Sequence, residues 1–183
     1  MEKKTAFIGH RNTPLSTVKE RLRDAVEKEI AEGCSSFIVG THGAFDKAAL
    51  SVCHEARQTH PELKVEVVLT SYHQVNAKNE SDILYRGDIT LLYDTEDTHY
   101  KKRIIIANQR MIDECDALIC YVDEKRKRSG AKRAMLYAKR KGVRIINLFQ
   151  ETDDPTFGMT NTQKTEYWKN YFAQLNRTEK LNK

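Results

Sequence analysis

The stretch Phe37–Leu50 constrains the fold more than any other part of the sequence. It begins with the apolar run Phe37-Ile38-Val39, passes through two glycines, Gly40 and Gly43, and ends in the helix-like segment Ala44–Leu50. This order predicts a buried strand, a glycine turn and a helix, which together point backbone N–H groups and the positive end of a helix dipole outward. Such a turn can bind phosphate or another anion. The alternative is a plain connection between a strand and a helix.

Asp46 lies in the first turn of this expected helix. A carboxylate at that position interacts favourably with the helix dipole. It is also placed to accept hydrogen bonds from the hydroxyl groups of a ribose. Both roles stay open at this point.

Short apolar runs alternate with amphipathic segments along the chain. The expected strands are Thr5–Gly9, Ser36–Gly40, Lys64–Thr70, Ile89–Tyr93, Ala117–Val122 and Arg144–Phe149. The expected helices are Pro14–Glu32, Ala44–Thr59, Tyr100–Glu114, Gly130–Lys141 and Thr160–Leu175, the last one followed by a frayed tail at 176–183. This alternation predicts a Rossmann-like α/β fold: a doubly wound, mainly parallel sheet with helices on both faces. We expect residues 1–183 to form a single domain.

The composition disfavours several classes of protein. Hydrophobic residues make up 39% of the chain and charged residues 31%. No apolar run approaches the ~20 residues of a membrane span, so no membrane partner is expected. Met1-Glu2-Lys3-Lys4 leads directly into the first strand, which predicts a cytoplasmic protein without a signal peptide. The four cysteines form no CxxC pair and the six histidines no HExxH motif, so we expect no metal site and no cofactor.

Polar segments follow several of the expected strands. The carboxyl ends of parallel strands share one rim of the sheet, and ligands bind there near the point where the strand order reverses. The segments gathered on this rim are Gly9-His10-Arg11, Gly40–Gly43, Tyr72-His73 and Ser129-Gly130. Tyr72 and Tyr121 are candidates to stack on a base. The GxGxxG fingerprint is absent, which disfavours an ordinary dehydrogenase.

Four segments, taken in order, carry a family resemblance. They are TAFIGHR (Thr5–Arg11), VGTHGAFD (Val39–Asp46), NQRMIDECDALICYVD (Asn108–Asp123) and SGAKRAMLYAKRKGVRIINL (Ser129–Leu148). This set resembles the YpsA-like branch of the SLOG superfamily, which is named after the Smf/DNA-processing proteins and the LOG cytokinin-activating enzymes. The resemblance implies a Rossmann-like fold whose rim binds nucleotides or nucleotide-derived small molecules. Some relatives cleave the N-glycosidic bond of nucleoside monophosphates, others sense nucleotide signals, and another branch binds single-stranded DNA.

The resemblance also implies roles for individual residues. The matched pairs are Gly9 with Arg11 in the first-strand motif, Gly43 with Asp46 in the GxFD turn, Arg110 with Asp113 in the NRxMxD-like helix, and Ser129 with Gly130 at the start of an SGG-type phosphate loop. Glycosidic members carry a GGxGTxxE loop, but Ser129–Met135 has neither its Thr nor its Glu. The arginine that those enzymes place four residues before the helix methionine is Ala107 here. Both departures argue against a LOG-type hydrolase.

These observations predict one ligand-binding rim. Its expected residues are Gly9, Arg11, Thr41, His42, Gly43, Asp46, Tyr72, Arg110, Ser129 and Gly130. The favoured function is binding or sensing of a nucleotide, a nucleotide sugar or a related small molecule. The alternative is a hydrolase that acts on nucleotides or nucleoside phosphates, with Asp46 or Asp113 as its catalytic carboxylate.

Two further features bear on partners. Ten Lys and Arg residues lie in the stretch 125–144. They predict either a basic face for phosphates, including those of nucleic acid, or an ordinary solvated helix surface. Trp168, Tyr171, Phe172 and Leu175 recur at helical spacing. They predict an apolar stripe that either packs on the sheet or forms a homodimer interface.

Overall fold

The computed structural model describes residues 2–13, 15–70, 88–92, 98–153, 156, 159–160 and 162–171. The chain divides into two compact units, Met1–Phe149 and Gln150–Lys183. The first unit contains the whole sheet and confirms the expected Rossmann-like α/β fold.

Six strands form one sheet in the order β4-β3-β2-β1-β5-β6, and every pair of neighbours is parallel. The strands are β1 (Lys3–Gly9), β2 (Cys34–Val39), β3 (Lys64–Leu69), β4 (Ile89–Leu92), β5 (Ala117–Tyr121) and β6 (Arg144–Asn147). Their ends lie within two residues of the expected ones. The described strands are thus fully parallel, rather than mainly parallel.

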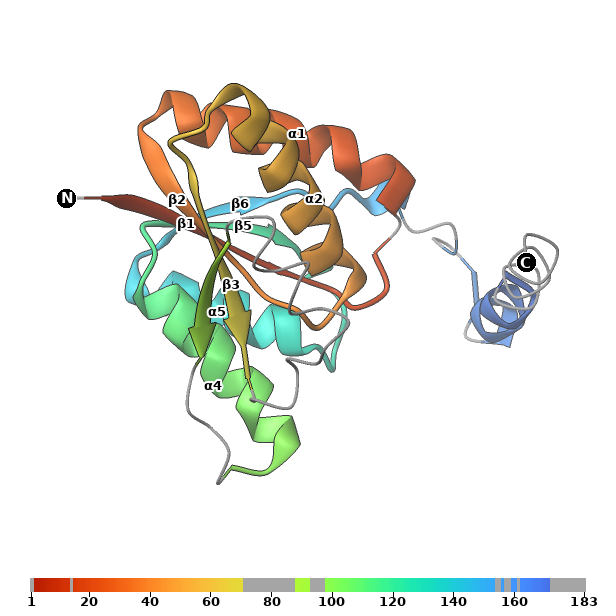
Figure 1. Cartoon of the computed structure of the whole chain (residues 1–183). Helices are drawn as coiled ribbons and strands as arrows, with labels where there is room; N and C mark the ends of the chain where they lie inside the picture. Colours follow the sequence, from red (N-terminus) through yellow and green to blue (C-terminus); the bar gives the residue numbers. More distant parts are fainter. Residues whose placement is uncertain are drawn as a thin grey trace, which may run out of the picture. The chain divides into compact units, whose positions relative to one another are not determined.

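Helices cover both faces of this sheet (Figure 1). They are α1 (Leu15–Ala31), α2 (Ala44–Thr59), α4 (Tyr100–Asp113) and α5 (Gly130–Lys141). The helices α1 and α2 pack on one face, and α4 and α5 pack on the other. This arrangement is the doubly wound architecture that the alternation of strands and helices predicts.

The side chains of β1 show how the core is divided. Phe7 packs with the cluster that includes Phe45 of α2. Ala6 and Ile8 point the other way and pack with the cluster that includes Met111 of α4. A strand alternates its side chains between two faces, so β1 is buried on both.

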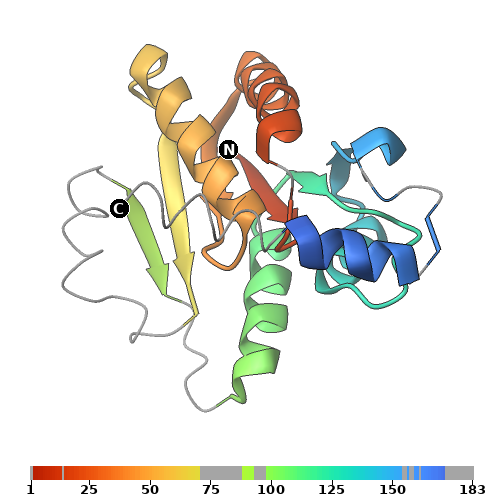
Figure 2. The same cartoon turned by 90° about the vertical axis from the view of Figure 1, so that its right-hand side faces the viewer.

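Strand β1 lies at the centre, where the order of strands reverses. Its residue Ala6 is paired with Ile38 of β2 and with Leu118 of β5. From β1 the chain builds outward through β2, β3 and β4, and α4 then returns it to the other side of β1 (Figure 2). The loops after β1, β2 and β5 therefore meet at the switch point, which is where sheets of this class bind ligands.

The second unit contains the short 3-10 helix η2 (Glu151–Asp153) and a helical segment at residues 162–171. Within this segment the rings of Tyr167, Trp168 and Tyr171 contact one another. Phe172 and Leu175 of the expected apolar stripe lie outside the described residues, so the homodimer stays a prediction. None of the described helices combines the length and the apolar character that crossing a bilayer needs.

A first prediction concerns Gly9, which ends β1 against α2. A Cβ at this position would lie 2.3 Å from Cγ of the fully buried Phe45. We expect Gly9→Ala to lower the free energy of unfolding by about 1–3 kcal/mol, because a close-packed core gives the ring little room to move. The control is Gly130→Ala, because a Cβ there would meet no atom within 4 Å. Urea unfolding compares the two variants, and equal stability would contradict the packing described here.

Candidate functional site

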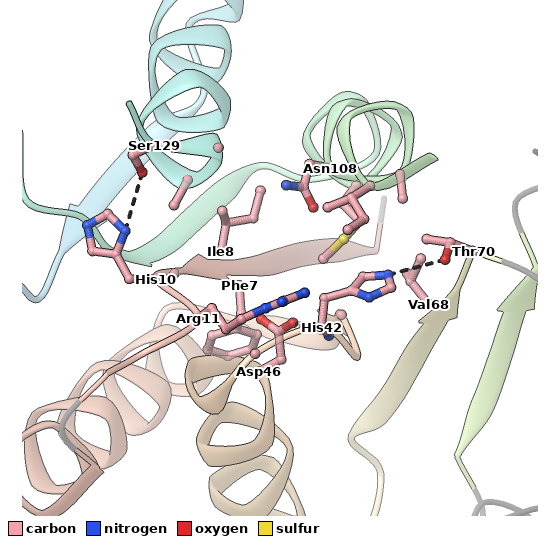
Figure 3. Close-up of a pocket in the computed structure, with 18 of the residues that line it drawn as sticks. Phe7, Ile8, His10, Arg11, His42, Asp46, Val68, Thr70, Asn108 and Ser129 are labelled. Atoms are coloured by element: carbon pink, nitrogen blue, oxygen red, sulfur yellow. Dashed lines mark hydrogen bonds between the residues drawn. The ribbon is translucent and has the colours of Figure 1, made fainter. Parts of the chain in front are cut away.

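A cleft of about 260 Å³ opens at the carboxyl rim of the sheet. Five described parts of Met1–Phe149 line it: the end of β1 with its following loop, the β2–α2 turn, the end of β3, one side of α4, and the loop that leads into α5 together with the start of that helix. Figure 3 shows Arg11 and His42 extending into this space, with Asn108 of α4 and Ser129 facing it from the opposite side. The cleft therefore lies at the switch point of the sheet.

The turn after β2 packs directly against the loop after β1. The backbone N–H of Ala44 donates a hydrogen bond of 2.9 Å to the carbonyl oxygen of Arg11. A Cβ on Gly43 would lie 3.0 Å from the Cα atom of Arg11, so glycine permits this close approach. As a result, the N-terminus of α2 is held beside Arg11.

Asp46 is a half-buried carboxylate that lines the cleft. Its Oδ2 atom accepts a hydrogen bond of 2.7 Å from the backbone N–H of His42. Burial raises the pKa of Asp46 to about 6, and the hydrogen bonds from the backbone N–H groups of His42 and Gly43 oppose that rise. A carboxyl group that changes its charge near neutral pH is typical of functional sites.

A second helix N-terminus reaches the cleft at α5. Ser129 is the N-cap of this helix, and its Oγ accepts a hydrogen bond of 3.1 Å from the backbone N–H of Lys132. Oγ also lies 3.3 Å from Nδ1 of the buried His10. The other ring nitrogen of His10, Nε2, accepts a 2.9 Å hydrogen bond from the backbone N–H of Asp123.

The neighbours of His10 do not suit a serine nucleophile. Burial and the nearby Arg126 lower the pKa of His10 to about 4, with Asp123 acting in the opposite direction, so the ring is neutral at pH 7. A neutral imidazole has one N–H, and Nε2 cannot carry it because Nε2 faces a backbone donor. The proton therefore sits on Nδ1, which faces Ser129. That nitrogen cannot take a proton from the hydroxyl, as a general base would have to do.

The positive charge of the described part of the cleft comes from three arginines. Arg11, Arg126 and Arg128 all line it. None of the three guanidinium groups forms a hydrogen bond or an ion pair with another described residue. The pKa of His42, like that of His10, is lowered by burial, and Arg11 adds to the effect, so neither histidine adds charge at pH 7. The cleft is thus positive through groups whose charge does not change with pH.

The wall formed by α4 has a different character. Ile104, Ala107 and Met111 present an apolar surface. Asn108 lies among them, half-buried, and its amide bonds to no other described residue. Ile104 is only partly buried because it borders the cleft.

The structure gathers most of the residues predicted for the rim. Gly9, Arg11, His42, Gly43, Asp46, Ser129 and Gly130 all line the cleft. Thr41 does not, because its side chain is turned to the neighbouring strand: Oγ1 donates to the carbonyl oxygen of Val68 at 3.2 Å. Tyr72 lies outside the described residues.

Two residues of α4 lie away from the cleft. Arg110 is exposed and does not line it. Asp113, at the end of the helix, accepts hydrogen bonds from the hydroxyl of Tyr137 and forms a 2.7 Å ion pair with Lys141, at the end of α5. Both helices begin at the carboxyl rim, so Asp113 lies toward the opposite rim of the sheet and is not placed to act in this cleft.

Tyr121 is not placed to stack on a base. Its ring is buried, only 3% exposed, and it packs against Phe45 and Phe149 in the core. The last residue of β5 thus belongs to the core rather than to the cleft.

The basic stretch 125–144 does not form one continuous face. Arg126 and Arg128 line the cleft. Arg144, at the start of β6, pairs with the buried Glu29 at 2.6 Å, and Lys141 pairs with Asp113. These cations therefore lie at both ends of α5.

Several cleft residues were not among the predicted site residues. They are His10, Thr70, Asn108, Met111, Arg126 and Arg128. His10 belongs to the segment Gly9-His10-Arg11, which was predicted for the rim, but it was not itself named as a site residue. The two arginines lie in an irregular loop, whose sequence has no periodicity to indicate which side chains turn inward.

Among the described residues, no three His, Cys, Asp or Glu side chains gather in a way that would hold a metal ion. Comparison of the sequence with models of known protein families and with curated proteins finds no match to either.

Proposed function

We propose that the cleft binds a nucleotide or a nucleotide-derived small molecule, and that its phosphate groups occupy the positive part of the cleft. The observation that carries this proposal is that Arg11, Arg126 and Arg128 line one cleft while none is paired with a described carboxylate. Guanidinium groups form strong, often bidentate hydrogen bonds with phosphate. The N-termini of α2 and α5 add favourable dipoles at the same place.

Asp46 and the α4 wall account for the rest of such a ligand. A carboxylate in contact with phosphate would be repelled, so Asp46 suits a sugar hydroxyl instead. The apolar side chains of α4, with Asn108 among them, suit the flat face and the polar edge of a base. The choice of a nucleotide rather than another anion also draws on the resemblance to the SLOG superfamily.

A thermal-shift screen over nucleotides and ADP-ribose-type compounds tests this proposal. A ligand that binds only the native state raises apparent stability, by about 2.7 kcal/mol when its concentration is a hundred times Kd. We expect compounds with both phosphate and ribose to raise the melting temperature more than inorganic phosphate does. If no anionic compound in the screen has an effect, the proposal fails.

The second candidate is a hydrolase for nucleoside phosphates. Asp46 favours it, because a carboxyl group with a pKa of about 6 can exchange protons near neutral pH. Incubation with nucleoside monophosphates, followed by chromatography for free base, decides between the two functions. Base release that is lost in Asp46→Asn would establish the hydrolase, and no base release by the wild type would leave binding as the function.

Two arginine variants test where the ligand binds. We expect Arg11→Ala to weaken a ligand found in the screen about ten- to a hundredfold, because a charge-assisted contact contributes about 1.5–3 kcal/mol. Arg110→Ala is the matched control: it removes the same group from an exposed position outside the cleft, and we expect no change in affinity. Isothermal titration calorimetry measures both. A larger loss in Arg110→Ala would place the site elsewhere.

The pKa of Asp46 predicts how stability depends on pH. Its folded value is raised to about 6 from the ordinary 3.8, so between these values the folded state binds more protons than the unfolded state. Stability therefore falls as pH rises through this window. We expect Asp46→Asn to raise the free energy of unfolding at neutral pH by on the order of 1–3 kcal/mol, and to lose most of this gain by about pH 4.

Urea unfolding at the two pH values measures this effect. Glu20→Gln, which neutralises an exposed carboxylate on α1, controls for the change in net charge. A destabilised Asp46→Asn at neutral pH would contradict the assignment of Asp46 as a carboxylate kept charged at a cost to the fold.

A further inference from the structure

The end of the cleft at α5 is built from hydrogen-bond donors. The first backbone N–H groups of a helix have no partner inside it. Gly130 and Ala131 line the cleft, and their backbone N–H groups bond to no other described residue. A Cβ on Gly130 would meet nothing within 4 Å, so a ligand can approach the helix start closely. Arg126 and Arg128 add guanidinium donors to the same end.

Among the described side chains that α5 and the loop before it turn to the cleft, the hydroxyl of Ser129 is the one that could either donate or accept; the amide of Asn108, which can also do both, comes from α4. The hydroxyl oxygen of Ser129 has two acceptor sites. The backbone N–H of Lys132 fills one of them at 3.1 Å, and Nδ1–H of His10 fills the other at 3.3 Å. With both acceptor sites in use, the remaining function of the hydroxyl is to donate its own proton. Since Ser129 lines the cleft, that proton is available to a ligand.

His10 determines that the hydroxyl of Ser129 acts as a donor toward the cleft. Its Nε2 accepts from the backbone N–H of Asp123 at 2.9 Å, and a backbone N–H can only donate. The ring proton is thereby confined to Nδ1, on the side of Ser129. His10 is thus a positioning residue, because it acts on a ligand through Ser129.

We propose that the α5 end of the cleft selects an oxyanion that carries no proton of its own, and that His10 sets this preference by holding Ser129 as a donor. Sulfate, a phosphodiester and a fully ionised phosphate monoester meet the requirement. A singly protonated monoester does not, because the described N–H groups and side chains of this end (the backbone N–H groups of Gly130 and Ala131, the guanidinium groups of Arg126 and Arg128, and the hydroxyl of Ser129) offer its P–OH no acceptor. The proposal rests on the cleft being an anion site, as proposed above.

The groups that face His10 keep it in this state over the range of the test. Arg126 and Asp123 come from the loop before α5, Tyr121 from β5 contacts the ring edge-on, and Ser129 comes from α5. Burial and Arg126 hold the pKa of His10 at about 4, against the opposing effect of Asp123. Elsewhere in the cleft, Asp46 changes charge near pH 6, and burial together with Arg11 lowers the pKa of His42.

The test compares methyl phosphate with inorganic sulfate by isothermal titration. Sulfate stays doubly charged, whereas a phosphate monoester takes up a proton with a pKa of about 6. If both ions bind as dianions, as proposed, the ratio of their affinities cancels changes in the charge of the protein, including that of Asp46. We expect the ratio of methyl phosphate to sulfate affinity to fall about tenfold from about pH 7 to pH 5, as the doubly ionised fraction of the monoester does.

A ratio that stays constant while both ions bind would overturn this inference alone, because the site would then accept the proton of the monoester. Failure of both ions to bind would overturn the proposed function as well. Asp46→Asn is the matched variant, because Asp46 is the one carboxylate among the described residues that line the cleft. We expect the affinity ratio of this variant to fall with pH as that of the wild type does. If the ratio falls only in Asp46→Asn, then Asp46 accepts the proton of the monoester in the wild type, and the proposal is contradicted.

Substitutions at the two residues test the link between them. We expect Ser129→Ala to lower sulfate affinity by roughly tenfold or more, as loss of a hydrogen bond to a charged group does. His10→Leu frees the hydroxyl to turn and should lower sulfate affinity by a smaller factor. His10→Asn keeps an N–H donor near Ser129 and should restore most of it. Full sulfate affinity in His10→Leu would overturn the role of His10.

A spectroscopic measurement on the wild-type protein locates the ring proton of His10 without any substitution. NMR of ¹⁵N-labelled histidine rings reports which ring nitrogen carries the proton. We expect the His10 proton on Nδ1 between about pH 5 and 7, above its pKa of about 4. A proton on Nε2 would overturn the proposal.

Discussion

The close approach of α2 to the end of β1 is the constraint on which the cleft depends. A Cβ at residue 9 would lie 2.3 Å from the ring of Phe45, so only glycine lets the buried ring pack against the strand. The hydrogen bond from Ala44 to the carbonyl of Arg11 then joins the helix start to the strand end. Packing in the core therefore places both Arg11 and the N-terminus of α2 at the switch point, before any ligand is present.

This placement leaves opposite charges in one cleft without pairing them. Arg11 and Asp46 both line it, but the carboxylate accepts backbone N–H groups of its own turn and forms no ion pair with the guanidinium. Burying a charge without a partner costs stability, and natural proteins accept such costs chiefly at functional sites. The arrangement keeps Arg11, Arg126 and Arg128 available to an anion from solution.

Much of the fold could be predicted because its signals are local. Apolar runs, glycine turns and helical spacing located the strands and helices, and the geometry of a parallel sheet then gathered the loops on one rim. It was harder to predict which face of a helix lines the cleft. The family motif suggested Arg110, but Asn108 lines the cleft instead. Two residues correspond to a turn of roughly 200° around a helix of 3.6 residues per turn, so a motif match does not determine which face is used.

The glycine amides offer the most direct measurement of the central claim, that an anion binds at the carboxyl rim. Gly9, Gly40, Gly43 and Gly130 line the cleft, whereas Gly33 and Gly142 precede β2 and β6 at the opposite rim. In an NMR titration of the ¹⁵N-labelled protein with pyrophosphate, we expect the four cleft amides to shift together and to saturate, while those of Gly33 and Gly142 stay in place. Saturating shifts at Gly33 and Gly142, with none at the four cleft glycines, would contradict the account.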